Sequence, residues 1–171
     1  MASITLYPNF DPETTSVDGF VSRYVGAGTT WADIHDGAGT DASPSGALMY
    51  AGWYKAGGGT TYTYLMRSIV LFDASTILGS TVVSAILSVY DTGSNSHADL
   101  DMNVYASAPA SNNDLVAADY GTLGTTALAT AIPNADLIAE GWKVFTLNAT
   151  GLAFIQAALN GNGIIKLGLR F

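Results

Sequence analysis

Cysteine is absent from this 171-residue chain, and charged side chains are scarce. Without cysteine there is no disulfide framework, no thiolate metal ligand and no cysteine nucleophile. Charged residues make up 12% of the sequence, about half of the roughly 25% found in typical soluble domains. Hydrophobic residues make up 49%. The surface is therefore expected to consist largely of threonine, serine, asparagine, glycine and alanine, as in extracellular proteins and in subunits packed into assemblies.

Basic residues are the scarcest charges. Six lysines and arginines stand against fourteen aspartates and glutamates, which gives a net charge of −8. Nucleic acids and anionic membranes attract clustered basic residues, so neither is an expected partner. No stretch reaches the length of a membrane-spanning helix. The opening MASITLYPNFDPE lacks the basic and apolar regions of a signal peptide, so secretion through such a signal is not expected.

Alternation of apolar and polar residues recurs along the chain and predicts about eight strands. These cover residues 3–7, 19–25, 47–54, 62–73, 82–91, 100–106, 142–147 and 164–171. Residues 25–46 and 107–141 are predicted to be long loops. Strands do not alternate with helices, and no repeat or linker divides the chain. We therefore predict a single domain, residues 1–171, folded as an all-β antiparallel jelly-roll sandwich.

Residues 146–171 add one short helix to this prediction. Asn148 and Thr150 are alternative N-caps, apolar residues follow at helical spacing, and Gly161 can end the helix. The strand after it alternates up to Phe171. We expect this strand to be a sheet edge, completed by residues 3–7 or by a neighbouring subunit.

The sequence predicts no catalytic residues. GxSxG, HExxH and P-loop motifs are absent, and both histidines, His35 and His97, lie in polar loops. Asp99 and Asp101 are predicted to share the outward face of one strand. That arrangement fits two glycosidase carboxylates and equally fits a solvated strand face.

Four aspartates could hold a structural calcium ion. Asp18, Asp33, Asp36 and Asp41 lie among glycines in or next to the first predicted loop. Calcium binds carboxylate and carbonyl oxygens from such loops, but these residues are also typical of turns. No EF-hand spacing occurs. We predict that no cofactor is required, with structural calcium at these aspartates as an alternative.

Aromatic residues supply the candidate contact site. Trp31 lies in the first long loop, and Trp53, Tyr54, Tyr62 and Tyr64 surround a glycine-rich turn. Aromatic faces stack on sugar rings and are also common at protein–protein contacts. Packing in the core explains such residues as well. We predict Trp31, Trp53, Tyr54 and Tyr62 as glycan or partner contacts.

Residues 67–90, RSIVLFDASTILGSTVVSAILSVY, combine an arginine in an apolar strand, a short turn and an SAxLxxY strand. This layout, together with residues 146–171, resembles the DNRLRE-type jelly-roll modules. Residues 102–121 are similar to uncharacterised tailed-phage virion proteins carrying that fold. The resemblance implies carbohydrate-binding-like or surface-displayed structural domains without catalysis. It also favours a structural role for Arg67, which would pair with a buried carboxylate or cap backbone carbonyls.

These observations favour a non-enzymatic virion structural protein of a tailed phage: a capsid decoration, head-fibre or tail-associated protein. It would act in the virion through lattice or subunit contacts, with itself or with other virion proteins, and could add adhesion to a cell-surface glycan. The first alternative is an extracellular carbohydrate-binding module, free-standing or part of a glycan-active protein. The second is a glycan hydrolase that uses Asp99 and Asp101.

Overall fold

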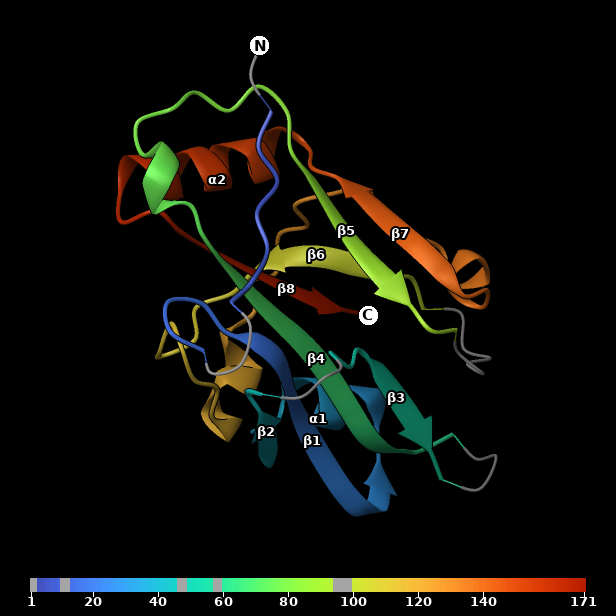
Figure 1. Cartoon of the computed structure of the whole chain (residues 1–171). Helices are drawn as coiled ribbons and strands as arrows, with labels where there is room; N and C mark the ends of the chain where they lie inside the picture. The colour runs from blue at the N-terminus through green and yellow to red at the C-terminus, as the bar shows by residue number, and fades with distance from the viewer. Residues whose placement is uncertain (1–2, 10–12, 46–48, 57–59, 94–99) are drawn as a thin grey trace.

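Two antiparallel sheets of unequal size make up most of the structure (Figure 1). The computed structural model describes residues 3–9, 13–45, 49–56, 60–93 and 100–171. The predicted antiparallel β-sandwich with a helix near the C-terminus is confirmed. The eight strands of the described ranges divide six and two between the sheets. One layer is therefore much broader than the other and presents surface that the smaller layer does not cover.

The larger sheet has the strand order β2-β1-β4-β8-β6, and β3 also pairs with β4. Its strands are β1 (Asp18–Thr29), β2 (Asp41–Ser43), β3 (Gly52–Lys55), β4 (Tyr62–Asp73), β6 (Asn103–Ala106) and β8 (Ile164–Arg170). Strand β4 is the axis of the sheet. It pairs with β1 along one side, whereas β3 and β8 share the other side. The first half of β4 consequently lies between β1 and β3.

The smaller sheet contains β5 (Ile86–Asp91) and β7 (Gly141–Thr146). Alternate residues of these strands, including Leu87 and Phe145, face the larger sheet and are buried there. They meet Val104 of β6 and Leu167 and Leu169 of β8 in the main core. Helix α2 (Ala149–Asn160) closes one end of this core.

A second core lies on the opposite face of the larger sheet. Val21 of β1 and Ile69 of β4 pack there against Ile34 and Tyr120. Ile34 belongs to helix α1 (Trp31–Asp36), and Tyr120 belongs to the 3₁₀ turn η2 (Ala117–Thr122). The larger sheet is thus covered on both faces by different elements, which accounts for the fully buried and mostly apolar middle of β4.

The connection at residues 107–141, predicted to be a loop, contains η2, a second 3₁₀ turn η3 (Asn134–Leu137) and three isolated bridges. Ala127 and Ile132 pair with residues of and next to β6, and Ala129 pairs with Leu147 after β7. The Asn103 side-chain amide also donates to the Ala129 carbonyl at 3.1 Å. The segment therefore joins the edge of one sheet to the end of the other.

Helix α2 begins where the sequence indicated. The Asn148 side chain accepts a hydrogen bond from the Gly151 N–H at 3.0 Å, so Asn148 is the N-cap and Thr150 lies inside the helix. Ile155 and Leu159 face the core. Within the described residues, no helix is both long enough and apolar enough to cross a membrane.

Three predictions are wrong. Residues 3–7 form no strand, since Ile4 and Tyr7 are exposed and pair with no sheet edge. Strand β8 is not a sheet edge, because it lies between β4 and β6. The predicted loop at residues 25–46 contains the end of β1, helix α1 and strand β2.

Several strand boundaries also differ from the predicted ones. Strands β3, β5 and β6 begin several residues later than predicted, although the start of the predicted 47–54 strand lies partly outside the described residues. Asn103, which has the same alternation as Asp99 and Asp101 and should therefore share their outward face, is buried. Its amide is used in the bridge to residues 127–132, which explains why a polar side chain is tolerated there.

Candidate contact surface

Three tyrosines from three neighbouring strands form one transverse row. Tyr24 of β1 and Tyr54 of β3 are both direct partners of Tyr64 of β4. The Tyr54 and Tyr64 rings stack, with centroids 6.1 Å apart and planes at 29°. The Tyr24 ring meets Tyr64 edge-on, also at 6.1 Å. We call Tyr24, Tyr64 and Tyr54 the tyrosine row.

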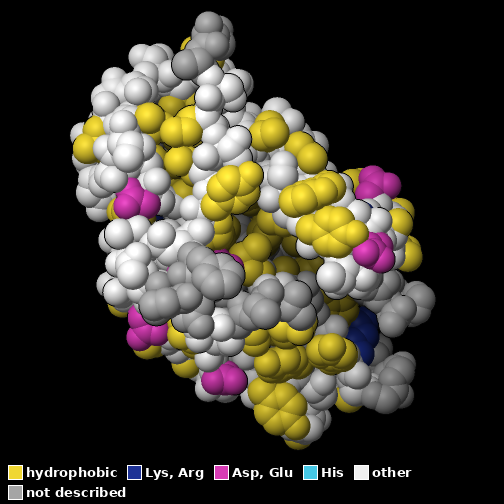
Figure 2. Space-filling model, viewed as in Figure 1, with side chains coloured by type: hydrophobic (Ala, Val, Ile, Leu, Met, Phe, Trp, Pro, Cys, Tyr) yellow, Lys and Arg dark blue, Asp and Glu magenta, His cyan; other side chains and the backbone are white. Residues whose placement is uncertain are grey.

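The outer members of the tyrosine row are open to solvent. Tyr24 is 61% exposed and Tyr54 is 62% exposed, whereas Tyr64 between them is half-buried. Figure 2 shows hydrophobic side chains gathered over this lower part of the molecule, where β1, β3 and β4 lie. Tyrosine combines a large apolar ring with a polar hydroxyl group. Its side chain therefore suits a surface that is exposed to water in the free protein and buried against a partner in a complex. The row can therefore stack on a sugar or pack against a protein.

The predicted contact residues are divided between the two faces of the sheet. Of Trp31, Trp53, Tyr54 and Tyr62, only Tyr54 lies in the tyrosine row. Trp31 and Tyr62 pack edge-on at 5.0 Å and join the second core. Trp53 also faces that core and meets Phe171 at 4.4 Å. These three side chains are half-buried and mainly serve packing.

A register shift in the sheet causes this division. The pairing of β3 with β4 slips between Tyr54 and Lys55, and the pairing of β1 with β4 slips between Tyr24 and Thr29. A bulge reverses the side to which following residues point. Tyr62 therefore faces the second core. The ammonium of the exposed Lys55 lies 5.2 Å from the centroid of the Tyr62 ring. Tyr64, two residues later, faces the other way.

The aspartates proposed as calcium ligands make local contacts. Asp33 accepts hydrogen bonds from the hydroxyls of Thr30, at 2.8 Å, and Thr29, at 3.0 Å. These bonds hold the pKa of Asp33 below its usual value. Asp36 accepts from the ring of His35 at 2.6 Å. Asp33 and Asp36 thus help to shape helix α1 and its ends.

Asp18 and Asp41 form their hydrogen bonds with backbone groups outside helix α1. Burial raises the pKa of the Asp18 carboxyl, and a backbone hydrogen bond lowers it in part. Asp41 accepts from the Ala42 N–H at 2.9 Å. In the described part of the chain, no three histidine or acidic side chains gather as a cation site. Structural calcium therefore stays a prediction.

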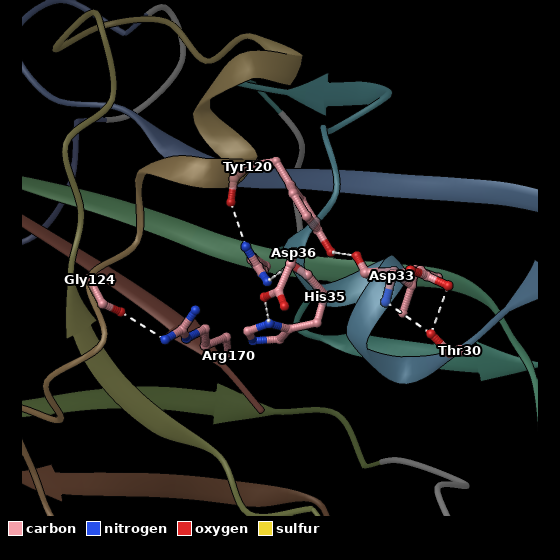
Figure 3. Close-up of polar contacts among 9 residues, drawn as sticks. Thr30, Asp33, His35, Asp36, Tyr120, Gly124 and Arg170 are labelled. Atoms are coloured by element: carbon pink, nitrogen blue, oxygen red, sulfur yellow. Dashed lines mark hydrogen bonds and ion pairs between the residues drawn. The ribbon is translucent and has the colours of Figure 1, made fainter.

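Arg67 holds helix α1 against the sheet. It is only 3% exposed, and its guanidinium donates to the Tyr120 carbonyl at 2.6 Å and to the His35 carbonyl at 2.5 Å. The Tyr120 hydroxyl donates to the Ile34 carbonyl at 2.7 Å. Figure 3 shows the Tyr120 ring extending from its 3₁₀ turn towards α1. Of the two structural roles considered for Arg67, the structure shows the capping of carbonyls.

The burial of this cluster has electrostatic consequences. The Arg67 guanidinium lies 4.0 Å from the Tyr120 ring centroid, a cation–π contact in a site screened from water. Burial raises the pKa of Tyr120 to about 12, although the nearby Arg67 charge acts in the opposite direction. Tyr120 therefore stays protonated and can donate to Ile34 at every physiological pH.

The polar groups considered for catalysis also make structural contacts. The His35 ring bonds to Asp36, and no described hydroxyl bonds to that ring, so no nucleophile–base pair is formed there. Asp101 is exposed and accepts from the Asn134 N–H at 3.2 Å. His97 and Asp99 lie outside the described residues.

Comparison with known proteins gives no match to a family model, a curated protein or a solved structure. The resemblance of residues 67–90 and 146–171 to DNRLRE-type modules therefore stays a prediction from the sequence.

A polar cleft of about 610 Å³ lies away from the tyrosine row. Its walls include Thr15, Asp73, Ser111, Asn112 and Asn162, so hydroxyl, amide and carboxylate groups line most of it. Asp73 ends β4, nine residues after Tyr64, which corresponds to about 30 Å along a strand. This cleft could not be predicted from the sequence, because its lining comes from four separate parts of the chain.

Proposed function

We propose that this chain is a non-enzymatic virion structural protein of a tailed phage, a decoration, head-fibre or tail-associated subunit that acts through surface contacts. The observation that carries the proposal is the tyrosine row, in which Tyr54 and Tyr24 are exposed on a sheet face. Clustered exposed aromatic residues are a mark of interaction surfaces. The row would be one of the contact surfaces.

The position of the row supports a contact role. Contact residues bind best when the elements beneath them are rigid, because little conformational entropy is then lost. The row lies across three hydrogen-bonded strands, and both cross-row pairs are in ring contact. Tyr54 and Tyr24 are thus presented by the sheet itself and not by a loop.

The charged side chains of the described sites form hydrogen bonds within the protein, which supports a role without catalysis. Arg67 caps two carbonyls, and Asp119 accepts from two backbone N–H groups. The Asp33 carboxylate accepts from the hydroxyls of Thr29 and of Thr30, the N-cap of helix α1. Catalytic groups, in contrast, need a free face towards a substrate and a pKa tuned to the reaction. The polar groups of the described sites hold loops in place.

The proposal is tested on purified phage particles from the source of this chain. We expect quantitative mass spectrometry to find the protein in fixed proportion to the major capsid protein. Tyr54→Ala should lower its incorporation, whereas Tyr7→Ala, which removes an exposed tyrosine outside the row, should not. Absence from the particles would contradict the proposal.

The polar cleft favours a second candidate, a carbohydrate-binding module. Sugar sites combine an aromatic face with hydroxyl, amide and carboxylate groups, and this chain presents both, although in separate places. A glycan array distinguishes the two candidates. Binding lost in Tyr54→Ala would place the sugar on the row, and binding lost in Asn112→Ala would place it in the cleft. No binding to any glycan would reject this candidate.

A further inference from the structure

The outer edge of β5 has no strand partner in the described part of the chain. β5 pairs with β7 alone. The Leu147 N–H donates to the Ala85 carbonyl at 3.0 Å, and hydrogen-bonded pairs alternate in an antiparallel ladder. Leu87 and Val89 therefore direct their backbone groups to β7. The N–H and C=O groups of Ile86, Ser88 and Tyr90 point to the unpaired edge.

The sequence and register of β5 lack several of the features that normally prevent edge pairing. Such features are lysine, proline, a bulge or a very short strand. Residues 84–91 read SAILSVYD, with no lysine, proline or glycine. The register between β5 and β7 is continuous from Ile86 to Asp91. Strand β5 is thus six regular residues with an unprotected edge.

The outward face of the same small sheet is apolar. An antiparallel sheet that faces water normally places polar residues outward. Here the exposed fractions are 65% for Ile86, 52% for Tyr90, 67% for Trp142 and 51% for Val144. We call these four residues the β5–β7 outer face. Figure 2 shows hydrophobic side chains gathered where β5 and β7 lie in Figure 1.

We propose that β5 pairs with β5 of a second copy of this chain, antiparallel and across a two-fold axis at Ser88. The joined sheets form one four-stranded sheet, with the two β5–β7 outer faces as a continuous surface. The proposal deepens the proposed function, since it names one partner of a structural subunit. It is tested by oligomeric state alone, so its failure leaves the test on phage particles unaffected.

The sequence of β5 is complementary to itself in this register. With Ser88 opposite Ser88 of the second copy, Ile86 lies opposite Tyr90 at both ends of the pair. Pairs of an aromatic and a β-branched residue are favourable across antiparallel strands. A two-fold axis requires that one surface match itself, and this register meets that condition.

The charges at the ends of the sheet are compatible with the same register. Each copy has a net charge of −8, so an interface between copies must keep acidic groups apart. Asp91 ends β5, and Glu140, which accepts from the Tyr90 hydroxyl at 2.7 Å, precedes β7 at the same end of the sheet. Antiparallel pairing places these ends at opposite extremes of the four-stranded sheet. No acidic side chain of the small sheet then lies opposite the same side chain of the second copy.

The test compares Ser88→Pro with Ser88→Ala. Because the Ser88 N–H points to the free edge, proline removes a donor for the second copy and none for β7. We expect sedimentation over a dilution series to show a dimer for the wild type and for Ser88→Ala, and a monomer for Ser88→Pro. Unchanged circular dichroism would show that Ser88→Pro folds. A wild type that stays monomeric, or a folded Ser88→Pro that stays dimeric, would overturn the proposal.

A second variant covers the case in which Ser88→Pro does not fold. Ile86→Lys places a charge on an already exposed side chain, next to Tyr90 of the second copy. We expect the dimer dissociation constant to rise at least tenfold, whereas Ile138→Lys, an exposed apolar residue outside the outer face, should leave it unchanged. Equal dissociation constants for the two variants would overturn the proposal.

Discussion

Tyr54 of β3 lies directly opposite Tyr64 of β4, and their rings stack with centroids 6.1 Å apart. One residue further along β3, the register slips, and Lys55 pairs with Tyr62 on the far side of the sheet. The bulge therefore separates the exposed tyrosine row from side chains that pack in the second core, within two neighbouring strands. Tyr62 and Trp31 pack in the second core, whereas Tyr54 on the opposite face stays exposed.

The stacking of Tyr54 on Tyr64 should be measurable in the free energy of unfolding. We expect a double-mutant cycle with Tyr54→Ala and Tyr64→Ala to give a coupling of about 0.5–1.5 kcal/mol, the range for aromatic pairs. Urea unfolding of the four proteins provides the values. A coupling near zero would mean that the rings do not stack in solution.

Arg67 should be more important for stability than any other arginine. Arg67→Met leaves the His35 and Tyr120 carbonyls without their charged donor, and each such bond contributes about 1.5–3 kcal/mol. We expect the free energy of unfolding to fall by about 3 kcal/mol or more. Arg23→Met is the matched control, because half-buried Arg23 donates to the single Ala38 carbonyl. Equal losses in the two variants would contradict this assignment.

Local signals in the sequence were sufficient for several elements. The predicted strand at residues 62–73 has the bounds of β4, since it is a long, mostly apolar run that follows a glycine-rich sequence and ends at Asp73. Helix α1 was missed, although Thr30 and Asp33 form a cap-like pair in which the Asp33 N–H bonds to the Thr30 hydroxyl. Its short length and polar surroundings concealed it.

The contact surface could be predicted only in part. Alternation placed Tyr24 on one face of its strand, but nothing local indicated that Tyr64 is its partner forty residues away. The bulge after Tyr54 is equally invisible in the sequence, so Tyr62 and Trp31 were grouped with it. Register is set by the packing of both cores, and that requires the whole chain.

The N-cap of α2 gives a prediction with a control two residues away. Asn148→Ala removes the side-chain acceptor for the Gly151 N–H and should cost about 1 kcal/mol. Thr150→Ala replaces an exposed residue inside the helix with a better helix former and should cost nothing. Thermal unfolding distinguishes them. A larger loss of stability for Thr150→Ala than for Asn148→Ala would indicate that Thr150, and not Asn148, is the N-cap.

Gly151 should resist a substitution that normally stabilises helices. Alanine in place of glycine usually stabilises a helix by about 1 kcal/mol. A Cβ at Gly151, however, would clash with the Leu128 carbonyl oxygen. We expect Gly151→Ala to destabilise the protein by about 1–3 kcal/mol, as overpacking does. Gly121→Ala, whose Cβ would meet nothing within 4 Å, should be tolerated.

Asp18 should make stability depend on pH in a direction opposite to most carboxylates. Burial raises its pKa in the folded protein, so the folded state binds more protons than the unfolded state between the unfolded value, about 3.9, and the raised one. Stability therefore falls as pH rises through this window. We expect Asp18→Asn to be more stable than the wild type at pH 7 and to lose that advantage at low pH.

Asp41→Asn is the matched control for this prediction. It removes one negative charge from an exposed position and keeps a side-chain acceptor for the Ala42 N–H. An equal gain at pH 7 in both variants would show that the effect arises from net charge and not from burial of Asp18.

The central claim is that the tyrosine row is a contact surface of a particle subunit. Hydroxyl-radical footprinting read by mass spectrometry tests it directly, by comparing Tyr54 in the isolated protein with Tyr54 in intact phage particles. We expect high reactivity of Tyr54 in the isolated protein and strong protection in the particle. Equal reactivity of Tyr54 in both states would contradict it.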